Sequence, residues 1–227
     1  MKKFVLSLAL CAASSSLCLA VIPDWADFNR YAKANAELMA QPNNGRRVVF
    51  MGNSITDFWP DKHPEFFSSH GFIGRGISGQ SSYQFLSRFR SDVINLHPKI
   101  VVINAATNDI AENTHVYDEE RTFGNIISMV ELARANGIDV VLTTTMPAGF
   151  FFWNKEIKDG PEKIESLNSR LKAYADEHNI PFVDYYSHML AEDGRSMDPR
   201  YTDDGVHPTA AGYEVMEKLI LEVLEKR

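Results

Sequence analysis

The chain has 227 residues, enough for one substantial domain, and its sequence contains no linker-like stretch that would divide it into two. Its hydrophobic fraction of 44% is ordinary for a globular protein. The formal net charge of −7 argues against a general binder of nucleic acid backbones, which needs a basic face. We therefore expect a small-molecule or neutral polymer substrate and no nucleic acid partner.

The first twenty residues have the pattern of a secretory signal peptide. Two lysines precede an apolar run over residues 4–13, and Ala20 with Cys18 supplies small residues at the −1 and −3 positions of a cleavage site. The run is short for a membrane span, and an uncleaved anchor or a core helix is the alternative. We predict a signal peptide over residues 1–20 and a mature domain over residues 21–227. The protein would be exported by a bacterium, periplasmic or extracellular, with no stable membrane insertion and, after loss of both cysteines, no disulfide.

Apolar runs of strand length alternate with helix-period segments along the rest of the chain. The runs over residues 100–103 and 140–142 are continuously apolar, as expected of strands that are covered on both faces. This pattern indicates a parallel sheet. We predict five strands, over residues 47–51, 72–77, 100–104, 140–145 and 182–185.

Helices are predicted before, between and after these strands. An opening helix is expected over residues 25–40, outside the sheet. Acidic residues at 118–120 mark the start of a second helix and Asn136-Gly137 its end, and a third helix begins at Pro161. The chain ends in a helix with apolar residues on one face. This alternation predicts the α/β class, a doubly wound three-layer α/β/α sandwich around a five-stranded parallel sheet.

The stretch RVVFMGNSIT, residues 47–56, places Ser54 directly after the first predicted strand. Ligands and catalytic groups lie at the carboxyl ends of strands in parallel α/β sheets, so Ser54 is a candidate nucleophile. The alternative is structural, because Gly, Asn and Ser also favour turns and helix caps. This stretch alone leaves both interpretations open.

The segment DDGVHPTAAGY contains the other groups that a serine nucleophile needs, a base and a carboxylate that orients it. Asp204 and His207 lie three residues apart before the last helix. At that spacing the carboxylate can reach one imidazole nitrogen and leave the other for Ser54. The alternative is that Asp204 forms a turn with Gly205 and that His207 only starts the helix.

Two further segments provide hydrogen-bond donors at strand ends. GRGISGQSS follows the second strand, and Gly79 can present its backbone N–H where a side chain would obstruct it. NAATNDI follows the third strand and places the Asn108 amide there. A nucleophile, a base with its orienting carboxylate and two oxyanion donors form the set that acyl transfer requires. Their coincidence favours the functional interpretation.

In order and spacing, GNSIT, GISGQ, ATND and DGVH resemble the four sequence blocks of the SGNH hydrolase superfamily, also called GDSL-like lipases or acylhydrolases. GISGQ is most similar to the branch around platelet-activating-factor acetylhydrolase and bacterial carbohydrate acetylesterases. The resemblance implies a flavodoxin-like fold, with Ser54 as nucleophile, His207 as general base and then acid, and Asp204 as its orienting group. It also implies an oxyanion hole formed by the backbone N–H groups of Ser54 and Gly79 with the side chain of Asn108.

The chain departs from the family pattern at two positions. Asn53 stands where an Asp is usual before the serine, and because it can still form hydrogen bonds we expect a structural turn contact to survive. Ala106 stands where a Gly is usual, two residues before Asn108, and its methyl group is expected near the site, where it could narrow the pocket. Neither change removes a catalytic atom.

Other hydrolase classes fit the sequence less well. The α/β-hydrolase signature G-x-S-x-G is not met, because Thr56 occupies its last position. A metal-dependent esterase is a weaker rival, since the remaining histidines are scattered without the short helical spacing of a zinc site. We expect no metal and no other cofactor.

Four side chains are candidates for substrate binding. Arg75 could bind a carboxylate or phosphate of the substrate, or pair with an acidic residue near the site. Phe152 and Trp153, in a long loop after the fourth strand, could stack on a sugar ring or line an acyl channel, or fold over the core of their own loop. Trp59, shortly after Ser54, has the same two interpretations.

We therefore predict a serine esterase, a carboxylic ester hydrolase that works through an acyl-enzyme. Its substrate would be a small-molecule or carbohydrate ester, from which it removes a short acyl group, chiefly acetyl. One alternative is a lysophospholipase or thioesterase on the same scaffold, which the lack of an amphipathic membrane-binding stretch disfavours. Another is a carbohydrate-binding protein without turnover. The sequence leaves the natural ester and the oligomeric state open.

Overall fold

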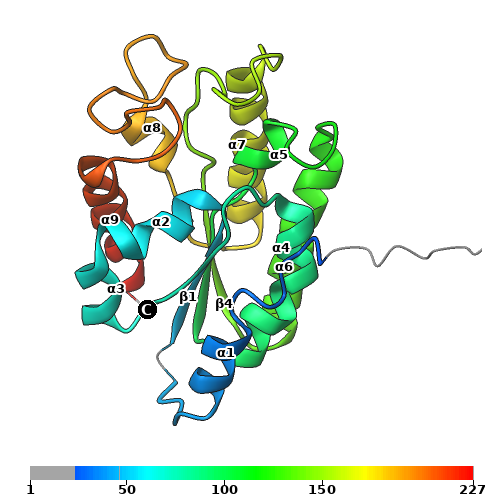
Figure 1. The fold of residues 1–227 in the computed structure, drawn as a ribbon, viewed down its shortest axis with the longest axis vertical. Coiled ribbons are helices and arrows are strands. Elements are labelled where there is room, and N and C mark those ends of the chain that lie inside the picture. Colours follow the sequence, from blue (N-terminus) through cyan, green and yellow to red (C-terminus); the bar gives the residue numbers. More distant parts are fainter. Residues whose placement is uncertain (1–23, 46, 227) are drawn as a thin grey trace, which may run out of the picture.

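The computed structural model describes residues 24–45 and 47–226, so the predicted signal peptide lies outside the described residues. Five parallel strands form one sheet in the order β2-β1-β3-β4-β5, which confirms the predicted fold class (Figure 1). The strands are β1 (Val48–Gly52), β2 (Ile73–Gly76), β3 (Ile100–Ile103), β4 (Asp139–Thr143) and β5 (Phe182–Val183).

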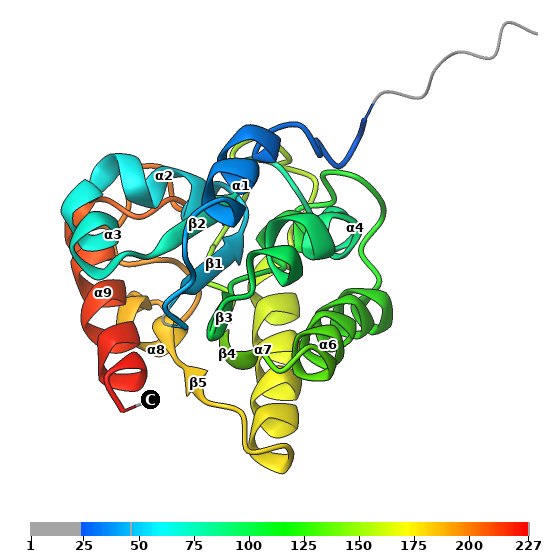
Figure 2. The ribbon, with the colours of Figure 1, turned by 90° about the horizontal axis from the view of Figure 1, so that it is seen from below.

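Helices cover both faces of the sheet, as its continuously apolar strands require (Figure 2). Successive side chains of a strand point to opposite faces, so Val49 and Met51 join one core while Val48 and Phe50 join the other. One face is covered by α4 (Ser82–Asp92), α6 (Glu119–Ala135) and α7 (Gly160–Glu177). The other is covered by α2 (Ser54–Lys62), α3 (Pro64–His70), α8 (Tyr185–Met189) and α9 (Ala210–Leu224).

The opening helix is shorter than predicted. Helix α1 spans Ala32–Met39, whereas residues 25–31 form mostly turns. Asp27 has a φ of 52°, in the left-handed region, which is incompatible with a continuous α-helix. The carbonyl group of Ala26 accepts a hydrogen bond from the Gln80 side chain instead of a helical N–H. The predicted start at residue 25 was therefore wrong, because these tertiary bonds leave no trace in the local apolar pattern.

Strands β2 and β3 end one residue before their predicted limits, and β4 and β5 end two residues before theirs. Residues 144–145 leave β4, and both of their hydroxyl groups bond to neighbouring backbone. Tyr185 begins α8 instead of ending β5, because the Asp184 side chain accepts the Ser187 N–H at 3.0 Å and caps that helix. The predicted limits of α6 are confirmed, with its caps at residues 118 and 136. Two short helices flank β3: η1 (Ile94–Leu96) precedes it and α5 (Thr107–Ile110) follows it.

The strand order determines where the functional loops meet. Strand β1 pairs with β2 on one side and with β3 on the other, so the connections that follow β1 and β3 leave the sheet in opposite directions. Such switch points, at the carboxyl edge of a parallel sheet, are the usual ligand sites of doubly wound folds. The loop before α9 lies above the same edge in the view of Figure 1.

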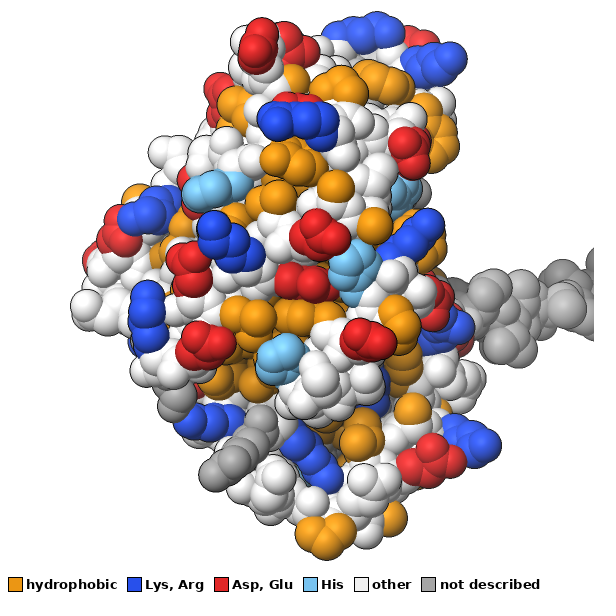
Figure 3. Space-filling model, turned by 90° about the vertical axis from the view of Figure 1, so that its left-hand side faces the viewer, with side chains coloured by type: hydrophobic (Ala, Val, Ile, Leu, Met, Phe, Trp, Pro, Cys, Tyr) orange, Lys and Arg blue, Asp and Glu red, His pale blue; other side chains and the backbone are white. Residues whose placement is uncertain are grey.

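The surface around α3 and α9 carries charges of both signs. Acidic and basic side chains are interspersed there, with apolar groups between them (Figure 3). This face offers no continuous basic surface of the kind that a nucleic acid backbone requires. In the part of the chain that the structure describes, every helix is too short or too polar to cross a lipid bilayer.

Candidate active site

Ser54 is presented at the N-terminus of α2 by a tight turn after β1. The Asn53 side chain accepts the Ile55 N–H at 3.0 Å and caps the helix, which confirms the turn contact expected of Asn53. Gly52 has no room for a side chain, since a Cβ atom there would lie 2.1 Å from Thr56 Oγ1. The turn therefore leaves Ser54 at the edge of a cavity, where the helix dipole favours negative charge.

His207 and Asp204 continue a hydrogen-bonded chain from Ser54. The Ser54 hydroxyl lies 2.9 Å from His207 Nε2, and His207 Nδ1 lies 2.7 Å from Asp204 Oδ2. Asp204 Oδ1 accepts the backbone N–H groups of Val206 and His207 at 2.9 and 2.8 Å, so the same carboxylate closes the turn. With its proton on Nδ1, His207 has Nε2 free to accept the Ser54 proton.

The environment of Asp204 keeps it ionised. Burial by itself would raise the pKa of this carboxyl, but the N–H groups of His207 and Val206 donate to it and outweigh that cost. The pKa of Asp204 is therefore below its ordinary value. The carboxylate is charged over the whole range in which histidines titrate, and it can stabilise an imidazolium.

Gly79 and Asn108 line the same cavity as Ser54 and His207. Gly79 has a φ of 79°, which glycine adopts without strain. Asn108 donates one amide N–H to the Gln80 oxygen at 2.9 Å, which leaves its second N–H. Within residues 24–45 and 47–226, the backbone N–H groups of Ser54 and Gly79 donate to no other group. Beside Ser54 and His207 lie two backbone N–H groups without a bonding partner among the described residues and the side-chain amide of Asn108.

The cavity is small and has an aromatic rim. The ring of Phe58 lies 5.3 Å from that of His207, and the rings of Phe152 and Trp153 each lie 6.4 Å from it, between centroids. All three rings are more than one third exposed, so the rim faces solvent. A larger cleft of about 610 Å³ beside α3 and α9 contains none of these groups. The cavity holds about 220 Å³ and is lined by Ser54, Phe58, Ser78, Gly79, Asn108, Asn113, Trp153 and His207.

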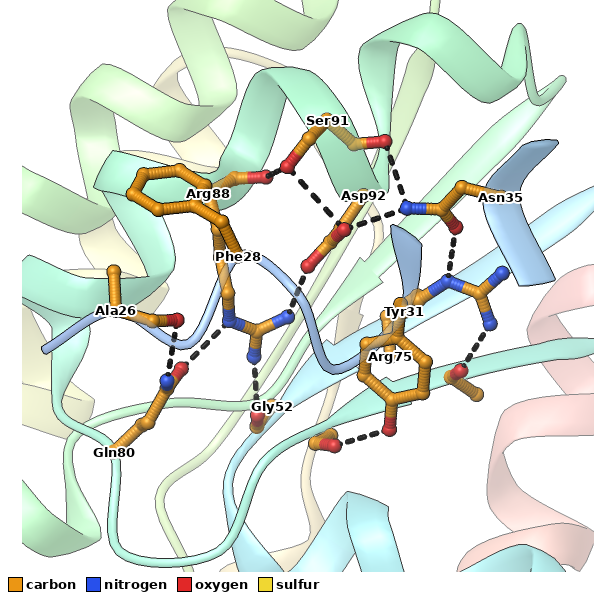
Figure 4. Close-up of polar contacts among 12 residues, drawn as sticks. Ala26, Phe28, Tyr31, Asn35, Gly52, Arg75, Gln80, Arg88, Ser91 and Asp92 are labelled. Carbon is orange, nitrogen blue, oxygen red and sulfur yellow. Dashed lines mark hydrogen bonds and ion pairs between the residues drawn. The ribbon is translucent and has the colours of Figure 1, made fainter. Parts of the chain in front are cut away.

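Arg75 does not line this cavity. The prediction that it binds substrate was therefore wrong. Arg75 is only 5% exposed, its Nε donates to Asn35 Oδ1 at 2.9 Å, and its guanidinium stacks on the Tyr31 ring (Figure 4). The alternative prediction, a pair with an acidic residue near the site, is also wrong, because its bonds go to an amide and to the Gly74 oxygen. Burial lowers the pKa of Arg75.

Trp59 is likewise a core residue and not a substrate contact. It is 2% exposed and stacks on Phe66 and Tyr213, and its Nε1 donates to Glu217 at 3.0 Å. It faces the sheet from α2, whereas the neighbouring Phe58 faces the cavity. Of the four predicted substrate contacts, Phe152 and Trp153 lie beside the cavity and Trp59 and Arg75 do not.

Ala106 points away from the cavity. It is 1% exposed and belongs to the core under α4, α6 and α7, so the expectation that its methyl group narrows the pocket was wrong. Its φ of 82° places an alanine in the left-handed region, which disfavours any residue with a Cβ atom. This backbone conformation explains why glycine suits the position.

Asn113 is a cavity residue that the sequence did not single out. Its Oδ1 accepts the Trp153 Nε1–H at 2.7 Å, and its Nδ2 donates to the Gly79 oxygen at 3.3 Å. It therefore joins the aromatic rim to the loop after β2. It lies in a polar turn after α5, where no local pattern distinguishes it from an ordinary turn residue.

A serine bonded to a His–Asp pair, beside free N–H donors at the switch point of a doubly wound sheet, is an arrangement that hydrolases of acyl groups use. Comparison with known proteins agrees with this class. Residues 50–215 match the GDSL-like lipase/acylhydrolase family, and the chain belongs to that family, whose members are hydrolases.

Two solved structures are highly similar to this chain. A candidate acylhydrolase of Bacteroides fragilis is 64% identical, with a TM-score of 0.88, over 89% of this chain and 98% of that one. A GDSL-like lipase of Bacteroides thetaiotaomicron is 59% identical, with a TM-score of 0.87, over 88% of this chain and 98% of that one.

Similarity to curated proteins covers only part of their length. A multidomain esterase of Ruminococcus flavefaciens is 29% identical over 128 residues, which are 56% of this chain and 16% of that protein. The chain spans about half of the length, or less, of the curated relatives that it matches.

Proposed function

We propose that the protein is a serine esterase that removes a short acyl group, acetyl first among them, from an oxygen of a carbohydrate or similar alcohol. The observation that carries the proposal is the chain of hydrogen bonds from Ser54 through His207 to Asp204, at 2.9 and 2.7 Å. A structural turn does not need these three groups to share protons, whereas a serine nucleophile does.

The reaction proceeds in two steps. His207 Nε2 accepts the Ser54 proton as Ser54 Oγ attacks the acyl carbon, and the three free N–H donors receive the oxyanion. Each such donor typically lowers the barrier by roughly 3 kcal/mol. The imidazolium, held by Asp204, protonates the departing alcohol oxygen. Water activated by the same nitrogen then releases the acid and restores Ser54.

The shape of the site supports a short acyl group and a flat alcohol. The cavity of about 220 Å³ is smaller than the roughly 300 to 1,000 Å³ of sites for drug-sized ligands. The exposed faces of Phe58, Phe152 and Trp153 lie beside His207, where the alcohol departs. Aromatic faces of this kind stack on the apolar faces of sugar rings. The pattern of residues 1–20 supports export of the protein.

The proposal is tested by hydrolysis of p-nitrophenyl esters from acetate to octanoate, with the protein beside Ser54→Ala and Ser78→Ala. We expect the highest kcat/KM on acetate and a loss of at least about 10³-fold in Ser54→Ala. Ser78→Ala is the matched control, because Ser78 also lines the cavity but donates its hydroxyl to Asp57 at 2.7 Å. It should keep most of the turnover.

Two results would count against parts of the proposal. A preference for octanoate would remove the acetyl assignment. Turnover that survives Ser54→Ala, or a folded protein that neither hydrolyses these esters nor reacts with a fluorophosphonate label, would overturn the serine mechanism.

A further inference from the structure

We propose that Arg88 and Gln80 are positioning residues that hold the oxyanion loop, residues 77–80, against the end of the nucleophile strand β1. The inference rests on the proposed function, because it concerns the geometry of the same site. Neither side chain lines the cavity, and both are buried, Arg88 completely and Gln80 to 97%.

Gln80 is bonded through its backbone and through both ends of its side chain, and Figure 4 shows the two side-chain bonds. Its backbone oxygen accepts an N–H of Asn108 at 2.9 Å. Its Oε1 accepts the Nε–H of Arg88 at 2.6 Å, and its Nε2 donates to the Ala26 oxygen at 2.8 Å. Gln80 also directly follows Gly79, so any rotation of Gln80 would displace two of the proposed oxyanion donors together.

Arg88, on α4, connects this loop to β1. One terminal nitrogen donates to the Gly52 oxygen at 3.1 Å, while Nε bonds to Gln80. The Gly52 oxygen also accepts the Ile77 N–H at 3.1 Å, so the strand end and the start of the loop meet there. A guanidinium is a rigid planar fork and therefore sets the spacing between Gly52 and Gln80. The single ammonium group of a lysine cannot hold both partners in that geometry.

The positive charge of Arg88 is balanced inside the network. Its other terminal nitrogen pairs with Asp92 at 2.9 Å, and Asp92 is 1% exposed. Arg88 therefore acts on the site by fixing positions and not by adding an unpaired charge.

Arg75 offers a matched control in the same network. Asn35 connects the two arginines, because it accepts from Arg75 and donates to Asp92 at 2.7 Å. Arg75 is almost as buried as Arg88, but its guanidinium bonds neither to the oxyanion loop nor to the end of β1. A loss of buried packing or of buried hydrogen bonds should affect both arginines, whereas a loss of positioning should affect Arg88 alone.

The test compares Arg88→Lys with Arg75→Lys on p-nitrophenyl acetate, at a temperature where thermal unfolding shows both to be folded. We expect kcat of Arg88→Lys to fall by about 10- to 100-fold with KM within about two-fold, because oxyanion donors act on the transition state. Arg75→Lys should unfold at a lower temperature yet keep kcat within about three-fold of wild type. The pH profile of kcat should not move in either variant, since both leave His207 and Asp204 in place.

A second variant keeps the inference testable if Arg88→Lys does not fold. Gln80→Met preserves size and removes both side-chain bonds, so its kcat should also fall with KM unchanged. The double variant Arg88→Lys/Gln80→Met should lose little more kcat than the more damaging single variant, because both substitutions break the same contact between Arg88 and Gln80. Equal kcat values in the two arginine variants, or losses that only follow the unfolding temperature, would overturn the inference and leave the esterase intact. Absence of Ser54-dependent turnover in the wild type would overturn both.

Discussion

At the residue scale, the proposed chemistry depends on one imidazole being held in a single tautomer. Asp204 Oδ2 lies 2.7 Å from His207 Nδ1, and its other oxygen is occupied by backbone N–H groups. A carboxylate can only accept in this position, so the proton of a neutral His207 is placed on Nδ1. Nε2 is then unprotonated where it meets the Ser54 hydroxyl.

Asp204→Asn would reverse this placement. Its oxygen can keep the turn bonds to residues 206 and 207, but its amide N–H would face Nδ1 and favour the tautomer with the proton on Nε2. We expect kcat on p-nitrophenyl acetate to fall by about 10³ to 10⁴-fold, as a comparable change does in a serine protease triad. Asp203→Asn, which changes the exposed neighbouring carboxylate, should leave kcat unchanged. A fall below ten-fold would count against this role of Asp204.

Substitution of Trp59 should lower stability, whereas substitution of Trp153 should weaken substrate binding. Trp59→Phe loses the bond to Glu217 and some buried area, so it should lower the unfolding free energy by about 1 to 2 kcal/mol with KM unchanged. Trp153→Ala, at a ring that is 38% exposed, should change stability little but raise KM on acetylated sugars several-fold. Urea unfolding and steady-state kinetics on both variants check this. The same KM for both would remove Trp153 from the proposed substrate contacts.

At the scale of elements, α2 lies so close to β2 that only a glycine fits between them. A Cβ atom at Gly76 would lie 2.2 Å from the Asp57 nitrogen and 2.6 Å from the Thr56 carbonyl carbon, both backbone atoms of α2. Backbone atoms cannot yield as a side chain does. Because α2 begins at Ser54, any shift of this helix also moves the proposed nucleophile.

Gly76→Ala should therefore damage both stability and activity. We expect a loss of about 3 kcal/mol in the free energy of unfolding, measured in urea, and a lower kcat in the molecules that remain folded. Gly74→Ala is the control on the same strand, since a Cβ there would meet Pro60 Cγ at 3.0 Å, an atom of a side chain. It should cost about 1 kcal/mol or less. Equal losses at the two positions would show that the contact with α2 is not tight.

At the scale of the whole molecule, one buried carboxyl affects how stability depends on pH. Asp109 is fully buried and accepts hydrogen bonds from the Ser82 backbone and hydroxyl and from the Thr122 hydroxyl. In the described part of the chain, no lysine or arginine forms an ion pair with it. Burial raises the pKa of Asp109 above its ordinary value.

The raised pKa of Asp109 makes its contribution to stability larger at low pH than at high pH. A carboxyl with a higher pKa in the folded state binds its proton more tightly there, so its contribution to stability is full below the unfolded pKa and is lost as pH rises through the folded pKa. We expect the Tm of the wild type to decline from mildly acidic to neutral pH through this group, and Asp109→Asn to show a flatter profile. Thermal unfolding from pH 4.5 to 8 measures this, with Asp203→Asn as an exposed control. Parallel profiles for wild type and Asp109→Asn would contradict it.

Much of the fold and of the candidate site was determined by the sequence alone. The continuously apolar runs at 100–103 and 140–142 lie within β3 and β4, because a strand covered on both faces places most of its side chains in an apolar core. Ser54, Asp204 and His207 could be predicted as candidates because they lie at a strand end and in a turn before a helix, although each stretch alone left a structural interpretation open and only their coincidence favoured the functional one. The order of these motifs then implied a common edge of the sheet.

Only the tertiary structure decided which side of each element faces the site. Trp59 and Trp153 have the same chemistry and similar sequence contexts, but one is packed under α2 and the other stands at the cavity. The methyl group of Ala106 lies in the core, and Arg88 donates directly to the oxygen of Gly52 in β1, a residue far from it along the chain. From a local stretch of sequence one can predict hydrogen bonds and apolar periodicity over only a few residues. Burial and long-range partners depend on which distant segments pack together, and that is settled only when the chain folds.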